Sequence, residues 1–118
     1  MEVGIDVEII DPTIDLNIAK NYFYNSEYKN IKKSKDPKDE FFKYWVLKES
    51  YMKYTGFGFN LNLNSFEIII EDEIRLKNDD TIKFSLFEIK DYKLGIASKY
   101  NVTSIKKYDI NELFNPIH

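Results

Sequence analysis

Cysteine is absent from this sequence of 118 residues, and histidine occurs once, as His118 at the last position. Without cysteine the chain has no disulfide bond, no thiolate zinc site and no cysteine nucleophile. A terminal residue is more often frayed than held in an active site, so we do not expect His118 to act as a general base. A Ser-His-Asp triad and a zinc site made of several histidines are therefore not expected.

Positive charge and long apolar runs are also scarce. The net charge is −3 and Arg75 is the only arginine, which does not favour a basic surface for nucleic acids. Apolar runs such as Ile68–Ile70 are far too short to cross a bilayer. The first residues lack the charged and apolar regions of a signal peptide. We therefore expect a cytoplasmic protein that binds neither nucleic acid nor a membrane.

The hydrophobic content of 43% is high enough for a folded core, and the length suits a single domain, residues 1–118. The sequence predicts a strand at Val3–Ile10 and then a helix that Asp15 could cap. We next expect a turn at Asn25–Tyr28 and an exposed, lysine-rich loop or short helix at Lys29–Lys38.

The strongest helical pattern covers Asp39–Thr55, where apolar side chains recur every three or four residues and Gly56 stands at the expected C-terminal cap. Stretches rich in β-branched and aromatic residues follow and predict strands. The predicted elements are strands at Phe66–Ile70, Thr81–Ile89, Tyr92–Ser98 and Thr103–Tyr108, and a last helical turn at Asn111–Phe114. This order indicates an α+β fold in which an antiparallel meander packs against helices.

Two carboxylates of the first predicted strand point to the same side. Side chains alternate along a strand, so Asp6 and Glu8 share one face with Gly4 and leave the apolar residues on the other. Neighbouring carboxylates repel each other unless a cation lies between them, and a metal ion is one explanation for the pair. The other explanation is that the pair lies on an exposed strand edge, which often carries acidic residues.

Glu49 and Lys53 stand one turn apart on the predicted helix and share a face. If the helix packs across the first strand, these side chains converge with Asp6 and Glu8. Three carboxylates suit Mg²⁺, which takes oxygen ligands at about 2 Å, and a lysine suits a phosphate oxygen. The set is typical of metal-assisted phosphoryl transfer, although Glu49 and Lys53 alone could form an ordinary solvated helix pair.

A longer pattern connects these residues. Gly4-Ile5-Asp6-Val7-Glu8 is followed by Trp45-x-x-Lys48-Glu49-Ser50-x-x-Lys53-x-x-Gly56-x-Gly58. The segments Ile18-Ala19-Lys20-x-x-Phe23-x-x-x-Glu27-Tyr28, Leu63-Asn64-Ser65-Phe66 and Tyr92-Lys93-Leu94 add to it. Together they resemble the 4′-phosphopantetheinyl transferases, and the chain looks like the C-terminal half of the surfactin-synthetase-activating type over nearly its whole length.

The resemblance implies the 4′-phosphopantetheinyl transferase fold and an enzyme that moves phosphopantetheine from coenzyme A to a serine of an apo acyl or peptidyl carrier protein. It implies Mg²⁺ held by Asp6, Glu8 and Glu49. Lys53 would contact a phosphate and protonate the leaving group, which suits the charge that develops there. Lys48 would be a weaker phosphate contact or a structural partner. Glu49 or Glu27 would accept the serine proton, and Glu27 could instead be a supporting group or a surface charge.

Only one half of the two-half enzymes is matched, and the half that grips the adenine and 3′-phosphate has no counterpart here. Three explanations follow from this. The chain forms a homo-oligomer, or it is a fragment or split subunit that needs a complementary N-terminal half, or it is a non-catalytic domain that binds a metal or a carrier protein.

Clustered carboxylates would also serve an Mg²⁺-dependent nuclease, but the acidic balance and the lack of a basic stripe argue against one.

Overall fold

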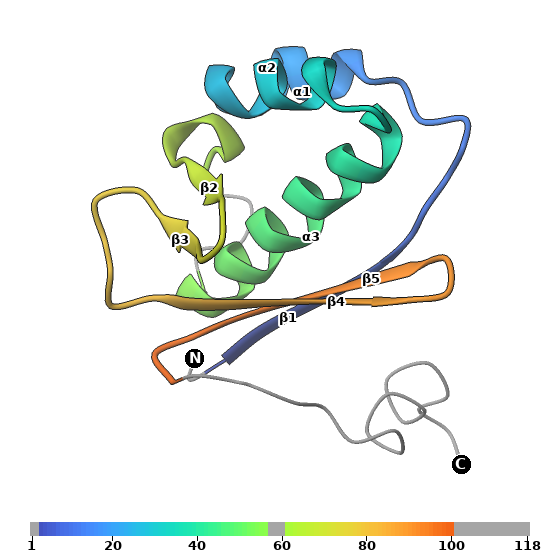
Figure 1. Ribbon diagram of the computed structural model, residues 1–118. Coiled ribbons are helices and arrows are strands. Elements are labelled where there is room, and N and C mark those ends of the chain that lie inside the picture. Colours follow the sequence, from blue (N-terminus) through green and yellow to red (C-terminus); the bar gives the residue numbers. More distant parts are fainter. Residues whose placement is uncertain (1–2, 57–60, 101–118) are drawn as a thin grey trace.

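The computed structural model describes residues 3–56 and 61–100 (Figure 1). Its elements follow one another along the chain. They are β1 (Val3–Ile9), α1 (Asn17–Tyr22), α2 (Asn25–Lys33), α3 (Pro37–Thr55), the short 3₁₀ helix η2 (Leu63–Ser65), β2 (Ile68–Ile70), β3 (Ile74–Leu76), β4 (Lys83–Ile89) and β5 (Tyr92–Ser98). The predicted α+β class is therefore confirmed.

Two antiparallel sheets hold the described strands. The larger has the order β1-β5-β4, so the first strand pairs with the last described one, and β2 pairs with β3 in a separate hairpin. Helix α3 lies across one face of the larger sheet, with α1 and α2 beyond it (Figure 1). The predicted antiparallel strands after the helices are therefore present, divided between two sheets, and β3 was not predicted.

Local signals fix both ends of α3. Asp36 accepts a hydrogen bond from the Asp39 backbone N–H at 3.2 Å, and Pro37 occupies the first turn, where its missing N–H costs nothing. The helix therefore begins two residues earlier than predicted. At the other end Gly56 adopts φ 75°, and its N–H donates to the Met52 carbonyl at 3.2 Å, so the predicted cap is confirmed.

The segment after α1 was predicted wrongly. A turn was expected at Asn25–Tyr28, but the chain forms the nine-residue helix α2. The Glu27 carboxylate accepts a hydrogen bond from the Tyr24 backbone N–H at 3.0 Å, which caps the helix. Only Glu27 and Ile31 are buried on α2, so its apolar stripe is too narrow to stand out among the lysines.

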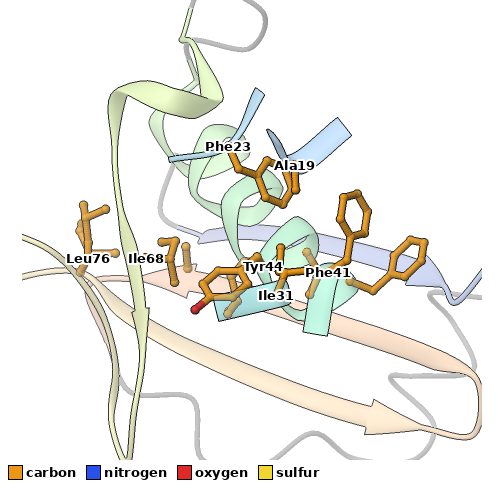
Figure 2. Close-up of a cluster of buried hydrophobic side chains, with 12 residues drawn as sticks. Ala19, Phe23, Ile31, Phe41, Tyr44, Ile68 and Leu76 are labelled. Carbon is orange, nitrogen blue, oxygen red and sulfur yellow. The ribbon is translucent and has the colours of Figure 1, made fainter. Parts of the chain in front are cut away.

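The hydrophobic core lies between α3, the two shorter helices and the β2–β3 hairpin. Figure 2 shows this cluster, in which Phe23, Ile31, Phe41 and Tyr44 from the helical part of the chain join Ile68 of β2. The rings of Phe23 and Phe41 stack with centroids 5.2 Å apart, and each is almost completely buried. Burying side chains of this size contributes about 1.5–3 kcal/mol each, so this cluster fixes α1 and α2 against α3.

Some predictions lie outside the described residues. These are the strand at Thr103–Tyr108, the helical turn at Asn111–Phe114 and Gly58. Among the described helices, none has the length and apolar character needed to cross a membrane.

Candidate functional site

Two glycines let α3 approach the sheet closely. A Cβ atom on Gly4 would lie 2.0 Å from the Ser50 carbonyl oxygen, and one on Gly95 would lie 2.6 Å from the Val46 carbonyl oxygen. Gly95 pairs with Asp6 across the sheet, so Gly4, Asp6 and Gly95 all face α3. The helix therefore packs on the acidic face of β1, the arrangement on which convergence of the site depends.

Asp6 and Lys53 meet in this contact. Asp6 Oδ1 lies 2.8 Å from Lys53 Nζ, the carboxylate is only 6% exposed, and the lysine side chain is half exposed. The second oxygen, Asp6 Oδ2, is buried and has no hydrogen-bond partner among the described residues. A buried carboxylate oxygen without a partner is costly, which calls for an explanation.

Glu8 lies beside Asp6 and is hydrogen-bonded to a side chain of α3. Its Oε1 accepts a hydrogen bond from the Trp45 indole Nε1–H at 3.0 Å. Burial raises the pKa of Glu8, and the neighbouring Asp6 carboxylate raises it further, while the indole hydrogen bond opposes the shift. The two carboxylates of β1 therefore lie close enough to repel each other.

Glu49 belongs to the same group. Partial burial raises the pKa of Glu49, the negative charge of Asp6 adds to the rise, and Lys53 opposes it. The structure thus brings together all four residues that the sequence selected from β1 and from the last part of α3.

The donor set suits a divalent cation. Carboxylate oxygens are the ligands that Mg²⁺ prefers, and a cation would supply the partner that Asp6 Oδ2 lacks. In the described parts of the chain, no group of three His, Cys, Asp or Glu side chains lies in a position to hold a metal ion, so the fit is one of ligand chemistry and not of finished geometry. Asp6 and Glu8 each have one oxygen engaged, by Lys53 and by Trp45 respectively. The residues therefore fit the metal chemically.

The remaining two predicted residues, Glu27 and Lys48, form a separate buried pair. Lys48 Nζ lies 2.8 Å and 3.0 Å from the two carboxylate oxygens of Glu27, and neither side chain is exposed. Glu27 also accepts from the Ile68 backbone N–H, and Lys48 donates to the Phe66 carbonyl. Burial raises the pKa of Glu27 and lowers that of Lys48. Of the roles left open for Lys48, this environment favours the structural one.

A groove of about 780 Å³ adjoins the acidic group. Glu49 and Lys53 line it together with the apolar side chains of Met52, Leu61 and Leu63. The sequence did not reveal this groove, because its walls come from α1, α3 and the segment that leads into η2. The Trp45 contact was also missed, although Trp45 precedes Glu49 by one helical turn and so faces the same strand.

Known proteins resemble this chain in sequence. The profile of the 4′-phosphopantetheinyl transferase superfamily matches residues 2–103, which is most of the chain. The chain belongs to this superfamily. The 4′-phosphopantetheinyl transferase Sfp of Bacillus subtilis is 35% identical over 102 residues, covering 85% of this chain and 45% of that protein. The transferase gsp of Aneurinibacillus migulanus is 34% identical over 125 residues, covering 96% and 52%.

The superfamily fold is also seen in solved structures. The crystal structure of holo-[acyl-carrier-protein] synthase from Thermotoga maritima has a TM-score of 0.67 to this chain at 17% identity, and covers 94% of this chain and 73% of its own. The fold predicted from the sequence is therefore confirmed. This superfamily member spans about half the length of the curated relatives that it matches.

Proposed function

We propose that this chain transfers the 4′-phosphopantetheine group from coenzyme A to a serine of an apo acyl or peptidyl carrier protein, in an Mg²⁺-dependent reaction. The single observation that carries the proposal is the Asp6–Lys53 ion pair where α3 crosses β1, with Glu8 and Glu49 near enough for the charge of Asp6 to act on both. Family membership supports the reaction class.

Asp6, Glu8 and Glu49 would hold the cation. When bound, Mg²⁺ would neutralise charge on the pyrophosphate of coenzyme A. The buried oxygen Asp6 Oδ2 supports this assignment, because it has no other partner in the described structure.

Lys53 would bind and protonate the leaving phosphate. In the proposed step the serine oxygen attacks the phosphorus that bears the pantetheine, the phosphoanhydride bond breaks, and adenosine 3′,5′-bisphosphate leaves. Lys53 is half exposed and lines the groove, so its ammonium is accessible to a phosphate there. Its charge would stabilise the leaving group as negative charge develops on it.

Glu49 is our choice for the base that accepts the serine proton. It lines the groove, and burial together with Asp6 raises its pKa, which makes the carboxylate a stronger base. Glu27 was the other possibility. We assign it a supporting role, because it is fully buried and already accepts hydrogen bonds from Lys48 and Ile68.

The groove and the helix surface suggest where the substrates lie. We place the pantetheine arm in the groove, whose apolar walls suit its carbon chain. Lys29, Lys32 and Lys33 are exposed on α2, while the chain as a whole is acidic. These lysines would attract an acidic carrier protein, since complementary charge speeds encounter. The cytoplasmic location expected from the sequence stays a prediction.

The alternative is a split or non-catalytic half-domain. Because the chain spans 45% of Sfp and 52% of gsp, this alternative places the rest of the coenzyme A site on residues outside this sequence, such as those of a second copy or of a complementary half. In its non-catalytic form, this alternative describes a domain that binds a carrier protein and transfers nothing to it.

The intact mass of an apo carrier protein tests the proposal. After incubation with this chain, coenzyme A and Mg²⁺, we expect a mass increase of one phosphopantetheine. Asp6→Ala and a sample treated with a chelator should show no increase. If the parent chain transfers nothing, the complementary N-terminal half is added in trans. Transfer only in its presence would establish the split enzyme, and no transfer in either case would contradict the proposal.

A further inference from the structure

Trp45 lies between the aromatic core and the acidic group. Its ring stacks on Phe41 with centroids 5.8 Å apart and an interplanar angle of 20°, and Phe23 lies 6.0 Å away. Phe23 and Phe41 are buried and stack on each other. The indole therefore has little freedom to rotate, because its position is fixed by two rings that are themselves fixed.

The one polar atom of this rigid ring is directed at Glu8. Indole Nε1–H can only donate, and it donates to Glu8 Oε1 at 3.0 Å across 37 positions of sequence. Glu8 is only partly buried, at the end of β1, and Asp6 stands two residues away on the same face. Without a donor, repulsion by Asp6 would favour rotamers that carry the Glu8 carboxylate away toward solvent.

We propose that Trp45 is a positioning residue, whose indole N–H holds the Glu8 carboxylate beside Asp6 in the orientation that a divalent cation requires. One oxygen of Glu8 is engaged by the indole, which leaves Oε2 to bind the cation. The inference rests on the proposed function, because it assumes that Asp6 and Glu8 bind a metal. Groups that orient the ligands of a metal typically change its affinity about 10- to 100-fold.

An isosteric replacement tests the hydrogen bond alone. Trp45 is the only tryptophan of the chain, so a tryptophan auxotroph can replace it with β-(3-benzothienyl)alanine, which has sulfur in place of the N–H. We expect Mn²⁺ affinity, measured by electron paramagnetic resonance on the chain alone, to fall about tenfold. The midpoint of thermal unfolding should change little, because the ring stack is kept. Trp45→Phe gives the same comparison if the analogue protein does not fold.

Two further variants separate the possible outcomes. Asp6→Asn removes a ligand and must weaken Mn²⁺ binding. If it does not, the metal site itself is wrong, and the role of Trp45 with it. If Asp6→Asn weakens binding while the Trp45 replacements do not, only the role of Trp45 is overturned. Phe23→Leu removes one of the two rings that fix the indole but keeps the indole N–H and its stack on Phe41, so it should lower the unfolding midpoint and weaken Mn²⁺ binding less than the Trp45 replacements do. An equal loss of affinity in Phe23→Leu would show that packing, and not the hydrogen bond, sets it.

Discussion

At the scale of single residues, Gly4 determines how close α3 can come to β1. There is no room for a methyl group at this position, since the nearest atoms are backbone atoms of Ser50 and Tyr54 at 2.0 and 2.3 Å. Backbone atoms cannot turn aside as the end of a long side chain can. The separation of β1 and α3, and with it the spacing of Asp6 from Glu49, therefore depends on a missing side chain.

Gly4→Ala should destabilise the protein by about 3 kcal/mol, the upper end of the usual cost of overpacking, because helix and strand must move apart. Urea denaturation measures the change. Gly56→Ala is the matched control, since no atom of the described residues lies within 4 Å of a Cβ there and only the φ of 75° is strained, at a cost of about 1 kcal/mol. Equal losses in the two variants would contradict this account of Gly4.

Lys53 should matter for catalysis far more than for stability. Its pair with Asp6 is half exposed on the lysine side, and such ion pairs contribute at most about 1 kcal/mol. Under the proposed function, Lys53→Gln lowers kcat for transfer about 100-fold, because charge on the leaving phosphate is no longer neutralised. Lys77→Gln removes an equally exposed lysine, 3.5 Å from Glu67, and should leave the rate unchanged. An unchanged rate in Lys53→Gln would remove Lys53 from the mechanism.

At the scale of elements, the Glu27–Lys48 pair joins α2 to α3 and to β2. Glu27 comes from α2 and Lys48 from α3, while Ile68 donates to Glu27 from β2. A buried pair costs desolvation energy, so it is weak evidence of net stability. Breaking it, however, leaves one charge buried without a partner.

A double-mutant cycle on this pair is therefore informative. Lys48→Met alone should cost about 3–5 kcal/mol of unfolding free energy, because Glu27 is then left without its counter-charge. The double variant Glu27→Gln with Lys48→Met should lose clearly less than the sum of the two single variants. Additive losses would mean that the two side chains do not stabilise each other.

A second ion pair joins α3 to the larger sheet. Lys93 of β5 lies 2.6 Å from Asp39 of α3 and 2.8 Å from Glu88 of β4, and it is almost fully buried. Burial alone lowers the pKa of Lys93, but the hydrogen bonds and charges of the two carboxylates outweigh it and raise the pKa above 10.5. The protonated form is therefore the one that the folded state favours.

This shift predicts the effect of alkaline pH. Because the folded pKa of Lys93 is raised, its contribution is complete below pH 10.5 and is lost as the pH rises through the folded value. Lys93→Met should cost about 2 kcal/mol at neutral pH, and the difference from the parent should shrink above pH 10.5. Lys43→Met, which removes a more exposed lysine 3.7 Å from the same Asp39, should cost less. A difference that stays constant to high pH would contradict this assignment.

At the scale of the whole molecule, the question is what completes the site. Residues alternate along β1, so Val3, Ile5, Val7 and Ile9 point away from α3, and Ile9 is 54% exposed. An exposed apolar face on a sheet favours contact with a partner, such as the second copy or the complementary half proposed above.

If a second copy completes the site, activity per chain should rise with protein concentration, and light scattering should give a dimer or trimer mass over the same range. If a complementary half is required, adding that half to this chain should restore activity at concentrations where this chain is monomeric. Full activity of a strict monomer would show that neither a second copy nor a complementary half is needed.

The sequence by itself determined much of this protein. The pattern of β-branched and aromatic residues predicted the first strand and the strand Tyr92–Ser98. The residue type of Gly56 predicted the end of α3. Each of these features depends on local backbone preferences. The spacing of Asp6 and Glu8, and of Glu49 and Lys53, predicted which side chains share a face, since that depends only on the strand and helix repeats.

Tertiary structure alone decided the rest. Helix α2 and strand β3 are too short, or too sparsely apolar, to be recognised without the partners that stabilise them. Nothing local indicates that Lys48 points inward to Glu27 while its neighbour Glu49 faces the groove, or that Trp45 donates to Glu8. These contacts depend on how closely α3 lies on β1 and on α2. That distance is set by packing between segments far apart in the chain, which local sequence preferences do not encode.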